Sequence, residues 1–208
     1  MFPSNFSLFN FFPLSLLWFA LIILDFDELS KEFFEKLKEW CGFDFKKYEL
    51  LFRGTRDGIN NFFNKCNNKG PTFTLIKNEK GDIFGGYASV PWEKGKNEKN
   101  DSNSFLFNFK NSFNISPVKF PSDGGGYAVR NYKNEILENI NYFHGPCFGC
   151  GTDLGTKGDV SKIFGWTWIG AAFKDVLNIG ASIFTGDSDK NNIYIRIKEI
   201  EVFQIFKQ

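Results

Sequence analysis

The sequence has almost no excess of charge of either sign. Its 208 residues include 25 Lys and Arg against 24 Asp and Glu, which gives a formal net charge of +1 at pH 7. A chain with this balance has no long-range field that would draw it toward nucleic acid. The densest charged stretch, residues 91–101, mixes both signs and indicates a solvated loop. We therefore expect no nucleic-acid partner.

Histidine and cysteine are also scarce. Any Ser-His-Asp or Cys-His centre would have to use His144, the single histidine, and Gly145 and Pro146 after it indicate a turn. A zinc site would need further ligands at compatible spacing, but the remaining candidates are scattered along the chain. We expect no catalytic residue, no metal and no cofactor. Four cysteines are too few for a disulfide framework, which favours a reducing, cytoplasmic compartment.

Two of the four cysteines, Cys147 and Cys150, form a CxxC pair. One interpretation is a redox-active pair that serves a thiol-based antioxidant or a peroxide sensor. A thioredoxin-like pair would need a helix N-terminus to lower the thiol pKa, whereas glycines surround this one. The other interpretation is two thiols in a glycine-rich loop.

Long hydrophobic runs are lacking apart from residues 8–24, which Asn10, Pro13 and Ser15 interrupt. Its continuous part is short for a helix that must cross a bilayer, and no Lys or Arg precedes it as in a signal peptide. A membrane anchor, a signal sequence, a helix packed on a partner and a misplaced start codon remain open. We treat residues 1–26 as a separate apolar segment. Association with an organelle membrane, if it occurs, is expected through residues 8–24.

The rest of the chain carries clear periodic patterns. Apolar residues at helical spacing predict an amphipathic helix that begins at Asp27, and residues 27–46 form this helix and a linker. Residues 72–77 and 83–90 alternate like strands and predict a hairpin. The alternation in the last run shifts phase near Lys198 and Glu199, which predicts a bulge. Residues 171–180 are compatible with one more short helix.

Short strands separated by Gly and Pro turns do not follow the strand-helix alternation of a doubly wound sheet. We therefore predict an α+β fold over residues 47–208: a two-sheet antiparallel β-sandwich with flanking short helices.

Two adjacent glycines, Gly85 and Gly86, stand inside one of the predicted strands. A phosphate-binding loop would need a strand, a glycine loop, a Lys and a helix in that order, which the surrounding sequence does not provide. Alternation puts the two glycines on opposite faces of the strand, so each removes a side chain where a neighbouring element approaches. We expect Trp92, after Pro91, to cover this stretch.

Near the C-terminus, Glu199 and Glu201 lie two apart and so on one side of a strand. Their charges repel unless a cation or hydrogen-bond donor lies opposite, and Arg53 and Arg56 are the candidate donors. A salt bridge on a polar sheet face and an acidic patch for a protein partner are both open.

Several motifs together resemble the TLDc domain of the oxidation-resistance proteins. They are LLFRGTRDG at 50–58, FFNKCNNKGPTFTLIK at 62–77, IFGGYASVPW at 83–92, DSNSFLFNF at 101–109, FGCGTDL at 148–154 and KEIEVFQI at 198–205. Phe63 and Thr152 stand where the family usually has His, and residues 155–175 match its pattern poorly. The resemblance implies a two-sheet sandwich, resistance to oxidative damage, binding of the vacuolar proton-pumping ATPase by several members, and no accepted catalytic chemistry.

The first hypothesis is therefore a non-enzymatic protein-interaction module. Its expected binding residues are Arg53, Arg56, Asp57, Glu199 and Glu201. The expected motif residues of the scaffold are Gly85, Gly86, Tyr87, Trp92, Phe105, Phe148, Gly149, Gly151 and Asp153. The alternatives are the thiol-based function of Cys147 and Cys150, and a structural component of a large assembly in which a Phe-rich surface packs permanently.

Overall fold

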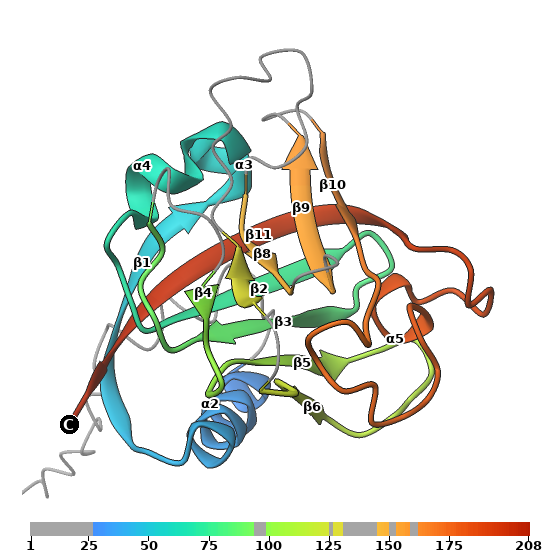
Figure 1. Cartoon of the computed structure of the whole chain (residues 1–208), viewed down its shortest axis with the longest axis horizontal. Coiled ribbons are helices and arrows are strands. Elements are labelled where there is room, and N and C mark those ends of the chain that lie inside the picture. The colour runs from blue at the N-terminus through green and yellow to red at the C-terminus, as the bar shows by residue number, and fades with distance from the viewer. Residues whose placement is uncertain (1–26, 94–98, 125–126, 131–144, 150–152, 159–161) are drawn as a thin grey trace, which may run out of the picture. The chain divides into compact units, whose positions relative to one another are not determined.

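The computed structural model describes residues 27–93, 99–124, 127–130, 145–149, 153–158 and 162–208 (Figure 1). The chain divides into two compact units, residues 1–37 and 38–208, with the boundary inside a helix. The predicted apolar segment, residues 1–26, lies outside the described residues.

The predicted amphipathic helix is confirmed as α2, Asp27–Cys41. The other helices are short: α3 is Gly54–Asp57, α4 is Phe62–Cys66, α5 is Ser182–Thr185, and a 3₁₀ turn covers Ile59–Asn61. In the described part of the chain, no helix is both long enough and apolar enough to span a bilayer.

Strands dominate the second unit. They are β1 Phe45–Arg53, β2 Thr72–Asn78, β3 Ile83–Ala88, β4 Lys99–Asn100, β5 Phe105–Lys110, β6 Val118–Pro121, β7 Tyr127–Arg130, β8 Cys147–Phe148, β9 Leu154–Gly158, β10 Ile163–Trp166 and β11 Tyr194–Lys207. They pair antiparallel in the order β4-β7-β8-β9-β10-β11-β2-β3-β5-β6, with β1 added on β11. The predicted hairpin is confirmed, because β2 and β3 pair from Thr72 opposite Ala88 to Lys77 opposite Ile83.

The long strand β11, red in Figure 1, joins the two halves of this order. One edge pairs with β2, while the other pairs first with β10 and then with β1. The predicted bulge is confirmed: Ile197 lies opposite Asn78 and Glu199 opposite Lys77, so Lys198 is the extra residue. The bulge keeps Ile195 and Ile197 before it, and Ile200 and Val202 after it, in one core cluster.

Strands far apart in the sheet order face each other across that core. Phe148 of β8 lies against Gly86 of β3, although four strands separate β8 from β3. The Phe148 ring also contacts Trp92 and Phe173, with centroids 5.5 and 6.5 Å apart. The sheet therefore folds back on itself. The antiparallel β-rich architecture with few short helices is confirmed, and the strands expected in two sheets are joined through β11 into one hydrogen-bonded order.

A second aromatic cluster occupies the other face of β2, β3 and β5. Phe73, Tyr87 and Phe105 are directly opposite one another across the three strands. Tyr87 lies 5.1 Å from Phe73 and 5.0 Å from Phe105 between ring centroids, and Trp40, in the last turn of α2, contacts Phe105 at 6.3 Å. Burial raises the pKa of the Tyr87 phenol. Of the phenylalanines that the structure describes, only Phe113 and Phe164 are exposed. The abundant Phe therefore fills the interior rather than the surface.

The short helix expected at residues 171–180 is wrong. The backbone N–H groups of Ala171, Ala172 and Phe173 donate to the carboxylate of Asp153. Those of Leu177 and Gly180 donate to Asp175. Side-chain acceptors thus hold backbone donors in this segment, and the helix α5 begins only at Ser182.

Candidate functional site

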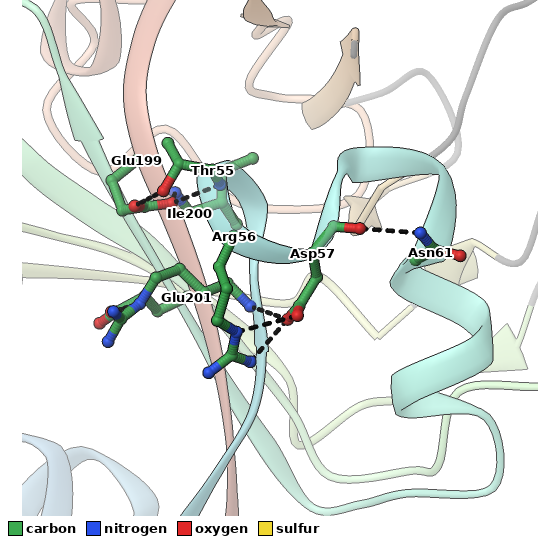
Figure 2. A network of polar contacts seen from close by, with 8 residues as sticks. Thr55, Arg56, Asp57, Asn61, Glu199, Ile200 and Glu201 are labelled. Carbon is green, nitrogen blue, oxygen red and sulfur yellow. Dashed lines mark hydrogen bonds and ion pairs between the residues drawn. The ribbon is translucent and has the colours of Figure 1, made fainter. Parts of the chain in front are cut away.

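The helix α3 lies beside the bulge of β11, and Figure 2 shows the polar residues around it. Gly54 starts α3 directly after β1 ends at Arg53. A Cβ atom on Gly54 would lie 2.7 Å from Ile163 Cδ1 and 3.5 Å from Glu199 Oε1. The absence of a side chain at Gly54 therefore lets α3 approach β10 and β11 closely.

A buried ion pair fixes the start of this turn. Arg53 and Glu201 are register partners across β1 and β11, and Arg53 Nε donates to Glu201 Oε1 at 2.8 Å. The Glu201 side chain is 1% exposed and that of Arg53 is 19% exposed. Burial raises the pKa of Glu201 to about 7, the positive charge of Arg53 opposes this rise, and the negative charge of Glu199 adds to it. Arg53 is thus one of the two expected donors.

The second carboxylate, Glu199, holds α3 itself. Its Oε1 accepts the backbone N–H of Thr55 at 3.1 Å, and its Oε2 accepts the Thr55 hydroxyl. The backbone N–H of Ile200 donates to the same carboxylate at 2.9 Å. Glu199 and Glu201 therefore have different partners. Glu201 accepts from the Arg53 guanidinium, and Glu199 accepts from Thr55 and Ile200.

The other expected donor, Arg56, bonds to Asp57 rather than to the two glutamates. Its Nε donates to Asp57 Oδ1 at 2.9 Å and its Nη2 to Asp57 Oδ2 at 2.6 Å. This bidentate contact lowers the pKa of Asp57, helped by the backbone N–H of Arg53, and raises that of Arg56. Gly58, directly after Asp57, is the N-cap residue of the 3₁₀ turn that follows.

The α3 cluster, defined as Arg53, Thr55, Arg56, Asp57, Glu199 and Glu201, therefore contains all five expected binding residues. Its charged groups bond to one another and to backbone amides, an arrangement that fixes geometry rather than moving protons. Thr55 and Arg56 are the exposed members, with the Arg56 side chain 48% exposed. What the cluster can do chemically is present a guanidinium in a fixed orientation.

The two glycines of β3 lie where neighbours approach closely on both faces. A Cβ on Gly85 would overlap the carbonyl oxygen of Thr74, and one on Gly86 would lie 2.7 Å from the Phe148 ring. Trp92 is buried beside Phe148, and its indole Nε1 donates to Thr72 Oγ1 at 2.9 Å. Strand β3 is thus part of the scaffold. Trp92 packs next to the Phe148 ring, and that ring covers Gly86.

Asp153, two residues after the FGCG motif, is a buried carboxylate that holds a distant loop. Asp153 is fully buried and accepts backbone N–H groups from residues 170–173 at 2.9 to 3.2 Å. Burial raises the pKa of Asp153, while these four amides oppose the rise. Gly149 has a φ of +88°, and a Cβ there would overlap Asp153 Oδ2.

The predicted redox pair is only partly described. Cys147 is buried on β8, whereas Cys150 and the motif residue Gly151 lie outside the described residues. The thiol-based function therefore stays a prediction. Of the other cysteines, burial raises the pKa of Cys41 to about 12 and also raises that of Cys66, which keeps both as thiols at neutral pH.

Sequence reasoning missed the outward side chains next to α3. Thr55 stands between the two expected arginines and was not singled out. Tyr194, Arg196 and Lys198 are exposed on β11 and alternate with the buried Ile195 and Ile197. The same alternation that predicted the bulge was the signal for this outer face.

Comparison with known proteins gives two findings. The sequence model of a family described as "TLDc domain" matches residues 28–206 of this chain. A zebrafish (Danio rerio) protein named "MTOR-associated protein MEAK7" is 38% identical over 62 residues, which is 29% of this chain and 14% of that protein. The similarity thus spans only a small part of the longer relative.

Proposed function

Because the chain belongs to the TLDc domain family, we propose that it is a non-enzymatic interaction module that binds a large protein complex. The proposed partner is the vacuolar proton-pumping ATPase, and the proposed physiological role is resistance to oxidative stress. The family supports an interaction role, since no accepted catalytic chemistry comes with it. The zebrafish relative is named as mTOR-associated, which supports membership of a protein assembly.

The observation that carries the proposal is the fixed geometry of the α3 cluster. Glu199 holds Thr55 and the Arg53–Glu201 pair holds the start of α3, so the exposed Arg56 stands on a turn that is already ordered. Binding to a turn of this kind costs less conformational entropy than binding to an unordered loop. Arginine is also among the residues that contribute most to binding energy at protein interfaces.

The test is binding of the purified chain to the purified ATPase from the same cells. We expect the two to co-elute in stoichiometric amounts during size-exclusion chromatography, and Arg56→Ala to weaken the complex about tenfold or more. Lys110→Ala is the matched control, since it removes an exposed cation at the end of β5, away from α3. Separate elution under conditions in which the pump stays assembled would reject the ATPase as partner. Equal loss in both variants would reject the α3 cluster as the contact.

A further inference from the structure

A second surface adjoins α3 on the outer side of β10 and β11. We call it the aromatic-basic face and define it by Lys162, Phe164, Trp166, Tyr194, Arg196 and Lys198. Register places the side chains together, because Phe164 lies opposite Arg196 and Trp166 opposite Tyr194. Alternate residues of both strands point into the core, so these six share the outer face.

The face is exposed and carries aromatic groups. Tyr194 is 72% exposed and Phe164 is 37% exposed, while Trp166 is half-buried over Gly155 of β9. Large exposed aromatics grouped on one sheet face are unusual on a surface without a binding role. Trp168, just beyond β10, is 66% exposed and adds to the aromatic content of this region.

The charge of this face is mostly positive. Lys162, Arg196 and Lys198 belong to it, and Lys157 of β9 lies opposite Phe164. Two carboxylates lie beside it among the described residues: Glu79, at 3.9 Å from Arg196 and with its side chain 61% exposed, and Asp187, which lines a neighbouring hollow with Tyr194 and Arg196. An ion pair this long and this exposed contributes little. The aromatic-basic face therefore has a local excess of cations, although the whole chain is nearly neutral. This excess is complementary to an acidic partner.

An ammonium group lies over one face of each of two rings, those of Phe164 and Trp166. Lys162 Nζ lies 5.9 Å from the Phe164 ring centroid, and Lys157 Nζ lies 5.7 Å from that of Trp166. Single-stranded nucleic acid binds aromatic surfaces by stacking bases on free ring faces. Cations placed over the rings instead present positive charge next to apolar ring edges, which suits carboxylates alternating with apolar side chains.

A hollow of about 250 Å³ lies at the junction between this face and α3. Thr55, Phe164, Arg196 and Lys198 are among the residues that line it. This volume is small compared with a drug-sized ligand site and suits one side chain of a docked segment.

We propose that the aromatic-basic face docks an acidic protein segment, with one apolar side chain in the hollow beside Thr55 and carboxylates on Arg196 and Lys198. This proposal rests on the proposed function and names the chemistry of the partner. It extends the contact surface from α3 across β10 and β11, so both surfaces bind the same partner side by side.

The probes are three fluorescein-labelled molecules: a short peptide in which Glu and Asp alternate with Phe and Leu, the same peptide with Lys for every acidic residue, and a short single-stranded RNA. Fluorescence anisotropy with the full chain measures each affinity. We expect the acidic peptide to bind most tightly, with an affinity that falls as salt is raised, because exposed charges are screened. Failure of the acidic peptide to bind, or equal or tighter binding of the basic peptide or the RNA, overturns the proposal.

Charge reversal then locates the site. We expect Arg196→Glu with Lys198→Glu to weaken the acidic peptide at least about tenfold. The matched control is Lys110→Glu with Lys174→Glu, which reverses two exposed lysines elsewhere and should leave affinity unchanged. Thermal unfolding of both double variants verifies that they remain folded. Equal weakening in both pairs overturns the proposal.

The ATPase experiment separates this proposal from the proposed function. If the pump binds and the Arg196 and Lys198 reversal leaves that complex intact, the aromatic-basic face is wrong and the function stands. If the acidic peptide binds at this face but the pump does not, the surface stands and the proposed partner is wrong.

Discussion

Two buried carboxylates in this molecule are neutralised in different ways. Asp153 is surrounded by four backbone amides from one loop, whereas Glu201 is paired with the side chain of Arg53. Backbone amides cannot move away without unfolding the loop, so Asp153 is a structural anchor. The Arg53–Glu201 pair instead connects the interior to α3, whose Thr55 and Arg56 reach the surface. The first arrangement stabilises the fold, and the second also orients the candidate binding site.

The largest expected effect is at the Asp153 anchor. Gly149→Ala should destabilise the fold by about 3 kcal/mol or more, because the added Cβ overlaps the Asp153 carboxylate at a backbone φ of +88°. Chemical denaturation measures the free energy of unfolding.

The control for this substitution is Gly81→Ala. Gly81 has the same φ of +88° with no atom within 4 Å of the Cβ position. Its cost should be only the backbone strain, about 1 kcal/mol. Equal losses at the two glycines would show that the contact with Asp153 has no energetic importance.

The next effect concerns the Arg53–Glu201 pair. Arg53→Ala leaves Glu201 buried without its cation and should cost about 3 kcal/mol above neutral pH. The loss should shrink as pH falls, since the isolated Glu201 then takes up a proton. Replacing both residues by Met should cost less than Arg53→Ala alone, because no buried charge is left. A double variant that is less stable than the single variant would contradict this view of the pair.

A smaller effect is the pH dependence due to Glu201. Its folded-state pKa of about 7 lies above its ordinary value of 4.5, so between these values the folded state binds the proton more tightly than the unfolded state does. This contribution to stability is present at low pH and is lost as pH rises through about 7. Glu201→Gln should remove it, and the difference between wild type and variant should change by about 1–3 kcal/mol from pH 8 to pH 5. Parallel stability curves for the two proteins would disprove the raised pKa.

Much of the frame around these carboxylates could be predicted from local pattern. Alternation located the β2–β3 hairpin and the bulge at Lys198, because a change of phase in a half-buried strand has few structural solutions. The helix α2 followed from apolar spacing. These features depend on neighbours in the sequence.

Long-range contacts could not be predicted in the same way. The anchor at Asp153 uses amides 17 to 20 residues further along, and no local pattern marks a backbone donor. The helix predicted at residues 171–180 is wrong for this reason: the sequence did not show that Asp153 accepts the backbone N–H groups of this segment. The partners of the two glutamates follow from the β1–β11 register, which places Arg53 opposite Glu201 and leaves Thr55 to Glu199. Without that register, the sequence could not show that Arg53 rather than Arg56 is the partner of Glu201.

The smallest expected effect on stability is at Arg56, and it isolates binding from folding. Arg56→Ala should change the free energy of unfolding by about 1 kcal/mol or less, because the Arg56 side chain is half exposed, although Asp57, whose side chain is 9% exposed, loses its cation. Asp57 keeps the backbone N–H of Arg53 at 2.9 Å, so the turn stays closed. Calorimetric unfolding measures this change. A loss as large as that of Arg53→Ala would show that Arg56 holds the fold together, and a weaker complex would then say nothing about contact. An unchanged stability makes any loss of partner binding a property of the exposed guanidinium itself.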